Sequence, residues 1–182
     1  MDEKLQIQKV LKGDTSAFGY FVDTYQDMAI TIAYRICENK QDAEDIVQNA
    51  FVKAFHNLHT FKSNSKFSTW LYRIVYNTAL TEIGSSSHNV QYVDYMQMET
   101  ADSYSSLDTI SQIEEKERTA LVNTALDKMP KDESLILSLF YMEDHSIKEI
   151  AQIAGLTESN VKVKLHRARK QMAEILTQLM KH

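Results

Sequence analysis

Apolar residues recur along this 182-residue chain at the three- and four-residue spacing that is typical of amphipathic helices. Four such stripes occupy its first part, and they begin at Leu5, Phe18, Ala43 and Phe67. Gly13 is expected to end the first helix, Asp14 or Thr15 to cap the second, and Asn39 to cap the third. Four helices joined by short loops can share one core, so residues 1–83 are predicted to form an N-terminal helical domain.

The periodic pattern weakens at Gly84 and returns at Ile113. The residues between are polar and acidic with scattered Tyr and Met, and they predict a flexible acidic linker over residues 84–112. Residues 113–182 are predicted to form a second domain of four helices. The expected fold is therefore all-α, with two small helical domains joined by the linker.

Turn and capping signals divide the second domain. The first of its four helices is expected to end at Met129, and the second to cover Glu133 to Met142. The third is expected to begin after Ser146, and the fourth after Thr157. Ser146 and Glu149 have the spacing of a capping box, in which each side chain binds the other residue's backbone N–H.

Composition narrows the class of protein further. Four Gly and one Pro are too few for the turns of a β-sandwich or barrel. Cys37 is the only cysteine, so no intrachain disulfide can form, which suits a reducing cytosol. No apolar run of about 18 residues occurs, and the opening MDEKLQIQKV lacks the apolar segment of a signal peptide. We therefore expect a cytoplasmic protein.

The net charge of −5 is distributed unevenly. No Lys or Arg occurs between Arg73 and Lys116, whereas six basic and two acidic residues follow Thr157. Nucleic-acid affinity is therefore expected in the last helix, and the middle of the chain would repel phosphate.

The most specific motif is IKEIAQIAGLTESNVKVKLHRARKQM, at residues 147–172. Small Ala151 allows two helices to cross closely, Gly155 suits a left-handed turn, and Val161 and Leu165 can hold the second helix against the first. This pattern predicts a helix-turn-helix whose second helix enters the major groove of DNA. The alternative is an ordinary amphipathic helix pair with a solvated basic face.

The residues give little sign of catalysis. The HNLH segment at 56–59 lacks the spacing of a zinc-protease helix, the six His and one Cys are scattered, and no Gly-rich loop could cradle phosphate. We expect neither an enzyme nor a bound cofactor or metal.

Several segments resemble a known family in the same order along the chain. SIKEIAQIAGL followed by TESNVKVKLHRARKQM resembles the promoter-binding domain of bacterial extracytoplasmic-function (ECF) sigma factors. DAEDIVQNAFVKAF resembles the polymerase-binding helix of that family, FSTWLYRIVYNTAL its helix for the −10 element, and MPKDESLILSLFYMED the start of its second domain. The resemblance implies a dissociable subunit that binds core RNA polymerase and directs promoter recognition, strand opening and transcription initiation.

The resemblance also implies roles for individual residues. Those that would bind polymerase are Asp42, Glu44, Asp45, Gln48 and Asn49. Those that would bind the melted −10 strand are Phe61, Lys62, Asn64, Ser65, Lys66, Ser68, Tyr72, Arg73, Tyr76 and Asn77. Those that would bind the −35 element are Thr157, Ser159, Asn160, Lys162, Val163, Lys164, His166, Arg167, Arg169 and Lys170.

Two of these regions have a plainer interpretation. The acidic and amide stripe that begins at Asp42 suits a basic partner helix, but it could equally be a solvated face near a helix N-terminus. Trp70 shares a stripe with Phe67, Leu71 and Ile74, which favours a place in the core over a role in base stacking.

One departure from the family leaves alternatives open. The family often has several Lys or Arg residues after the −10 helix, and residues 81–89 have none. Fewer phosphate contacts would weaken binding near −10. The chain could therefore be a degenerate sigma factor or adaptor recruited by a separate DNA-targeting protein, including an RNA-guided one. A stand-alone helix-turn-helix regulator is a further alternative, and an anti-sigma factor is a partner that the family implies.

Overall fold

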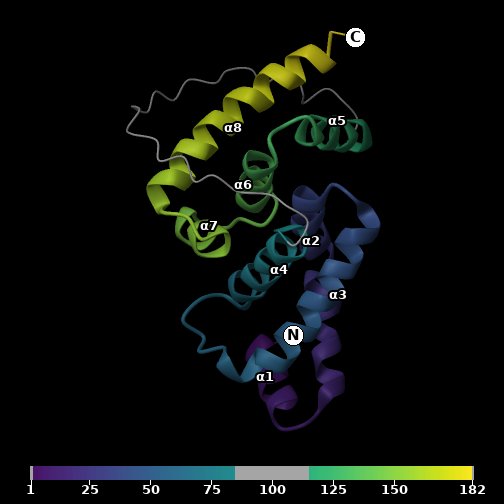
Figure 1. Ribbon diagram of the computed structural model, residues 1–182, viewed down its shortest axis with the longest axis vertical. Coiled ribbons are helices and arrows are strands. Elements are labelled where there is room, and N and C mark those ends of the chain that lie inside the picture. Colours follow the sequence, from purple (N-terminus) through teal and green to yellow (C-terminus); the bar gives the residue numbers. More distant parts are fainter. Residues whose placement is uncertain (1, 85–114, 182) are drawn as a thin grey trace.

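The computed structural model describes residues 2–84 and 115–181. Throughout these residues the secondary structure consists of helices and turns without strands, which confirms the expected all-α fold. The predicted linker, apart from Gly84, lies outside the described residues. The described residues form two groups of helices, one from each end of the chain (Figure 1).

The first group contains four α-helices around an apolar core. They are α1 (Glu3–Leu11), α2 (Gly19–Cys37), α3 (Lys40–Asn57) and α4 (Phe67–Gly84), with short 3-10 helices at Thr15–Phe18 and Leu58–Thr60. Phe21, Ile32 and Leu71 are completely buried where α2, α3 and α4 pack together. Asn39 caps α3 as predicted, because its side-chain oxygen accepts hydrogen bonds from the N–H groups of Gln41 and Asp42.

Two details at the N-terminus differ from the sequence prediction. Neither Asp14 nor Thr15 caps an α-helix, because the 3-10 helix precedes α2 and α2 begins only at Gly19. Of the apolar residues in α1, Val10 is buried, whereas Leu5 and Leu11 are about half exposed and the polar Gln6 is buried. A short helix at the edge of the molecule has one narrow contact face, so apolar spacing alone did not identify that face.

The second group forms the predicted helix-turn-helix. Its helices are α5 (Glu115–Asp127), α6 (Lys131–Tyr141), α7 (Ile147–Ala154) and α8 (Glu158–Leu179). The capping box of Ser146 and Glu149 is present, and the Thr157 hydroxyl accepts a hydrogen bond from the N–H of Asn160 at 3.2 Å. Helix α5 ends two residues before the predicted Met129.

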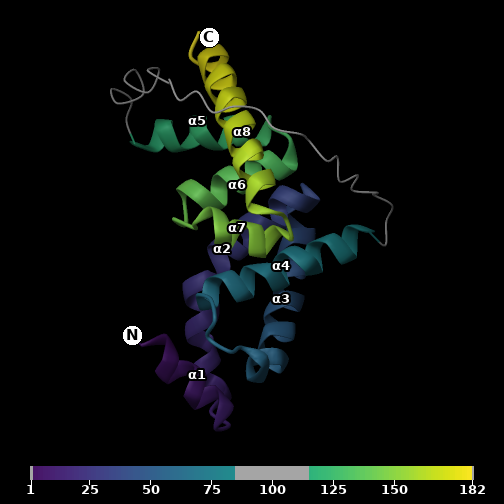
Figure 2. The same cartoon turned by 90° about the vertical axis from the view of Figure 1, so that its left-hand side faces the viewer.

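The two groups of helices pack directly on each other, which the sequence did not predict. Helix α4 lies against α7, and α2 lies against α6. In both views α7 lies between α8 and α4 (Figure 2). Buried apolar residues of the two groups form one continuous cluster. The −10 helix suggested by the sequence is therefore covered on one side by the helix-turn-helix group.

We predict that position 155 requires glycine because of its left-handed backbone conformation, and not because a larger side chain would clash with a neighbour. Its φ is +67°, and a Cβ built there would meet no atom within 4 Å. Gly155→Ala should lower the free energy of unfolding by about 1 kcal/mol, with a smaller loss for Gly155→Asn, which tolerates the left-handed region better. Denaturant unfolding followed by circular dichroism measures both.

Gly19 provides the control for this prediction. It has an ordinary helical conformation, φ −53°, and equally open surroundings. Gly19→Ala should leave the stability unchanged or raise it. Equal stability of Gly155→Ala and the wild type would contradict the prediction.

Candidate functional site

Helix α3 presents a polar face to the surface. Its buried side consists of residues such as Ala43, Ile46 and Ala50, and all five residues that the sequence assigns to polymerase contact are exposed. Asn49 donates a hydrogen bond from its side-chain nitrogen to Glu82 of α4 at 3.1 Å. The helical geometry that buries one stripe of α3 thus leaves the acidic and amide side chains available to a partner.

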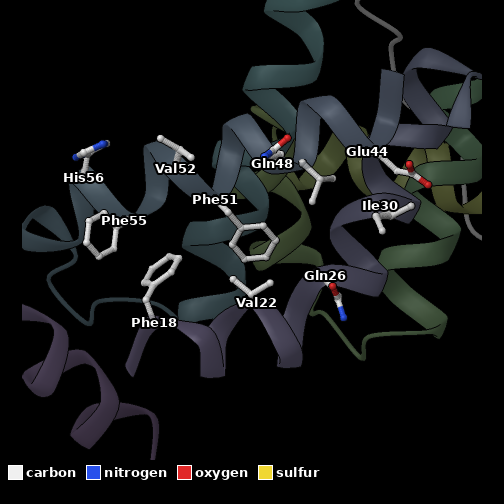
Figure 3. Close-up of a pocket in the computed structure, with 11 residues that line it drawn as sticks. Phe18, Val22, Gln26, Ile30, Glu44, Gln48, Phe51, Val52, Phe55 and His56 are labelled. Carbon is white, nitrogen blue, oxygen red and sulfur yellow. The ribbon is translucent and has the colours of Figure 1, made fainter. Parts of the chain in front are cut away.

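An apolar groove of about 560 Å³ runs beside this face, between α2 and α3. Figure 3 shows Phe18 and Val22 facing Phe51 across it. Its lining consists of Phe18, Val22, Gln26, Ile30, Glu44, Val47, Gln48, Phe51, Val52, Phe55 and His56. The sequence pattern did not predict this groove. The one residue that points to it is Val52, which is apolar, lies outside the buried stripe of α3 and is 52% exposed.

The groove divides the predicted acidic stripe into two parts. Glu44 and Gln48 belong to the wall of the groove, whereas Asn49 is turned toward α4. An apolar channel edged by carboxylate and amide groups can accept a helix that has an apolar stripe and basic flanks. The arrangement therefore suits a helical protein partner better than a small charged ligand.

The residues assigned to the −10 strand are only partly accessible. Lys62, Asn64, Lys66, Arg73 and Asn77 are exposed. Phe61, Ser65 and Tyr76 are half-buried, and Ser68 and Tyr72 are buried. The exposed members give the loop and one side of α4 the cations and amides that can contact a nucleic-acid strand.

Trp70 belongs to an aromatic cluster. It is half-buried, and the centres of its ring and the Phe61 ring are 5.5 Å apart, as are those of Trp70 and Phe67. This packing agrees with the interpretation of Trp70 as a packing residue. It also fixes Phe61, which the sequence assigned to the −10 strand.

Tyr72 and Lys66 contact the helix-turn-helix group. The hydroxyl of Tyr72 donates a hydrogen bond to Glu143 at 3.2 Å, and its ring meets that of His145 edge-on at 5.6 Å. Lys66 forms an ion pair with Glu149 at 3.1 Å. Residues that the sequence assigned to DNA therefore bind protein in this structure.

Burial and charge perturb the groups at this contact. Burial lowers the pKa of His145, while Glu149 opposes that effect and Lys66 adds to it. Burial raises the pKa of Glu143, against the hydrogen bond from Tyr72. Burial would also raise the pKa of Glu149, but hydrogen bonds from the backbone and side chain of Ser146, with Lys66, lower it to about 2. Neutral His145 and ionised Glu149 are thus the favoured forms.

Apart from the capping residue Thr157, all the residues assigned to the −35 element lie on α8, the second helix of the helix-turn-helix. Thr157, Ser159, Lys162, Arg167 and Lys170 are exposed; Asn160, Val163, Lys164, His166 and Arg169 are half-buried. The exposed cations lie on one 22-residue helix whose N-terminal turn is capped by Thr157, and a helix of this kind can enter a major groove.

Two of the predicted DNA-binding cations are held by α6. Lys164 forms an ion pair with Asp132. Arg169 donates a hydrogen bond to the Tyr141 hydroxyl at 2.8 Å and lies over the rings of Phe140 and Tyr141. Their charges are therefore partly used within the protein, which leaves Lys162 and Lys170 as cations more fully directed to solvent.

The described residues show neither a metal-binding cluster nor a membrane-spanning helix. Within residues 2–84 and 115–181, no three His, Cys, Asp or Glu side chains gather in a way that could hold a metal ion. None of the described helices combines the length and apolar character needed to cross a membrane.

Comparisons with known proteins identify relatives of the whole chain. The model for Sigma-70 region 2 matches residues 21–88, and that for Sigma-70 region 4 matches residues 119–172. The chain is 32% identical to the ECF RNA polymerase sigma factor SigW of Bacillus subtilis (strain 168), with 97% of each chain covered. It is 30% identical to the ECF RNA polymerase sigma-E factor of Escherichia coli (strain K12), with 93% of this chain and 91% of that protein covered.

Solved structures share its fold. CnrH, solved in complex with the cytosolic domain of CnrY, gives a TM-score of 0.66 at 21% identity, with 97% of each chain covered. The sigma factor RpoE from Bartonella quintana, solved with the anti-sigma factor NepR, gives 0.63 at 21% identity, with 88% of this chain and 96% of that chain covered.

We predict that acid destabilises the contact at His145. A group whose folded pKa is lowered favours the fold in its neutral form, so its contribution is complete above its ordinary value of 6.5 and is lost as the pH falls below it. The melting temperature should fall between about pH 7.5 and about pH 5.5, and His145→Asn should reduce this dependence. Protonation of Glu143 has the opposite sign, so the difference between the two proteins isolates His145. Identical pH profiles would contradict the prediction.

Proposed function

The chain belongs to the ECF family of RNA polymerase sigma factors, and on that premise we propose which of its surfaces bind polymerase and which bind promoter DNA. As a member of this family, it binds core RNA polymerase and directs promoter recognition in transcription initiation. The assignment of residues to these steps is our proposal.

The α2–α3 groove and the neighbouring polar face of α3 form the proposed polymerase surface. The observation that carries this assignment is the combination of exposed Val52 with Glu44 and Gln48 in the wall of one open groove. Apolar contact supplies affinity, and the acidic and amide groups select a basic partner helix and its register. None of the described residues from 115 to 181 lines the groove, so these helices leave it open to polymerase.

Promoter DNA is assigned to two other surfaces. The loop before α4 and the side of α4 that carries Arg73 and Asn77 would hold bases of the melted −10 strand, with Lys62 near the phosphates. The exposed side of α8, with Lys162 and Lys170, would enter the major groove at the −35 element. Each step consists of binding and strand capture, so we propose no catalysis by this chain and no cofactor.

Location and inhibition follow from the same premise. A protein that binds RNA polymerase works where transcription takes place, so we place it in the bacterial cytoplasm. RpoE from Bartonella quintana was solved with an anti-sigma factor, and we extend that class of partner to this chain as a proposal.

A second candidate function rests on the absence of cations after Arg73. Residues 74–84 complete α4 without a Lys or Arg. Such a chain could keep its polymerase surface and depend on a separate DNA-targeting protein, such as an RNA-guided one, for its position on DNA. Gel-shift assays of the holoenzyme on promoter DNA test this alternative, and tight binding without any added protein would exclude it.

We predict that the α3 surface carries polymerase binding. Asp45→Ala/Gln48→Ala should weaken binding to purified core polymerase at least about tenfold, because charged and amide contacts at a partner's helix are lost. Val52→Asp should have a similar effect, because it places a charge in the apolar groove. Titration of labelled protein with nucleic-acid-free core polymerase measures these affinities.

Glu174→Ala/Gln178→Ala is the matched control. It removes the same two kinds of side chain from exposed positions of α8, away from the groove, and should bind polymerase like the wild type. Normal binding by the α3 variants would contradict the surface assignment. Absence of binding by the wild type would contradict the proposed function itself.

We also predict unequal roles for two lysines of α8. In the holoenzyme, Lys162→Ala should lower affinity for promoter DNA and reduce the slope of log affinity against log salt concentration by about 1. Lys164→Ala should change the slope less, because Lys164 already pairs with Asp132. Fluorescence anisotropy at several salt concentrations measures both slopes. A larger effect at Lys164 would contradict this assignment.

A further inference from the structure

The last turn of α6 carries two aromatic rings beside the recognition helix. Phe140 is half-buried, whereas Tyr141 is 59% exposed. The centres of the two rings are 5.0 Å apart, and the ring planes meet at 75°. Because α6 packs against α8, the rings form an aromatic corner that a side chain of α8 can enter.

Arg169 of α8 occupies this corner. Its guanidinium carbon lies 5.4 Å from the centre of the Phe140 ring and 5.8 Å from that of Tyr141, and its Nε–H donates a hydrogen bond to the Tyr141 hydroxyl at 2.8 Å. Helix α6 ends at Tyr141 with no basic residue in its last turn, so Arg169 also brings a cation to the negative end of that helix. These attractions fix a side chain that is otherwise among the most flexible.

The charge of Arg169 is held in place without being neutralised. Among the described residues Arg169 forms no ion pair, whereas Lys164 on the same helix pairs with Asp132. Arg35, which also lies over a tyrosine ring, pairs with Asp127. A cation held by rings and a hydroxyl keeps its attraction for a phosphate, while an ion-paired cation must first give up its carboxylate.

The hydrogen bond to Tyr141 leaves the phosphate-binding part of Arg169 unused. A guanidinium has N–H donors on three nitrogens, and only the Nε–H is taken here. The two terminal nitrogens have no hydrogen-bond partner among the described residues, and neither is buried. Two parallel N–H groups match two phosphate oxygens, a geometry that arginine provides and lysine does not.

Arg169 is also in register with the proposed −35 surface. It follows Lys162 by seven residues, which places it about two turns, or about 10.5 Å, further along the same side of α8. The first turns of a recognition helix lie nearest the base edges, and contacts to the phosphates fix its position in the groove. Arg169 is thus suited to a phosphate contact at the edge of the groove that Lys162 would enter.

We propose that Tyr141 is a positioning residue for promoter binding: it holds the guanidinium of Arg169 with its terminal N–H groups free for a phosphate of the −35 element. This proposal rests on the proposed function, because it takes α8 as the helix that enters the major groove. Tyr141 does not contact DNA itself. It acts by restricting Arg169 before binding, which lowers the entropy that this side chain loses when DNA binds.

The test measures promoter affinity and its salt dependence in the holoenzyme by fluorescence anisotropy. Tyr141→Phe loses only the hydroxyl and should lower affinity about threefold, whereas Tyr141→Ala also loses the ring and should lower it about tenfold. Both variants should keep the slope of log affinity against log salt concentration, because the charge of Arg169 remains. Arg169→Ala should lower affinity and also reduce that slope by about 1.

Combined variants show whether Tyr141 acts through Arg169. In an Arg169→Ala background, Tyr141→Phe should have no further effect on affinity. Arg169→Lys keeps the charge but has no Nε–H, so it should keep the slope, lower affinity about threefold and also abolish the effect of Tyr141→Phe.

Tyr34→Phe is the matched control. It removes the same hydroxyl from a half-buried tyrosine whose ring lies beside Arg35, in the first group of helices. Its promoter affinity and salt slope should equal those of the wild type. Circular dichroism verifies that each variant is folded.

The outcomes separate this proposal from the function on which it rests. Wild-type affinity of Tyr141→Phe, together with reduced slopes for Lys162→Ala and Arg169→Ala, would overturn the positioning role alone. An effect of Tyr141→Phe that persists in the Arg169→Ala background would also overturn it, because Tyr141 would then act without Arg169. Wild-type promoter affinity of both Lys162→Ala and Arg169→Ala would overturn the assignment of α8 to the −35 element, and this proposal with it.

Discussion

The packing of α4 against α7 is the constraint on which the remaining surfaces depend. Tyr72 lies in this contact. Burial, and to a smaller extent the nearby charge of Glu143, raise the pKa of its hydroxyl, which therefore stays protonated and donates a hydrogen bond to Glu143. Because α7 is joined to α8 through the rigid turn at Gly155, the position of α7 also sets that of the recognition helix. One contact thus couples the two proposed DNA-binding surfaces and prevents them from being presented independently.

The proposed polymerase surface follows a different physical principle. Its groove is lined by Phe18 of the 3-10 helix, Val22 of α2 and Phe51 of α3, and it leaves Val52 of α3 52% exposed. An exposed apolar side chain costs little stability when it stands alone, yet with Glu44 and Gln48 beside it the surface becomes specific.

Much of the fold was predictable because local rules govern it. Asn39, Ser146, Thr157 and Gly155 fixed the starts and turns of three helices through capping and backbone conformation, which depend on a few adjacent residues. The start of α2 was not predictable in this way, because a 3-10 helix and an α-helix have similar apolar spacing over one turn. The acidic face of α3 could be predicted, but the groove beside it required knowing how α2 lies against α3.

The sequence by itself determined the helices, the helix-turn-helix and the cations along α8, because periodicity and capping are encoded within single segments. Only the tertiary structure decided which of those groups are available. It showed that Tyr72 is buried, that Lys66 pairs with Glu149, and that Asp132 and Tyr141 hold two cations of α8. These partners lie between 28 and 83 residues apart in the chain, and contacts over such separations leave no periodic signal in the sequence.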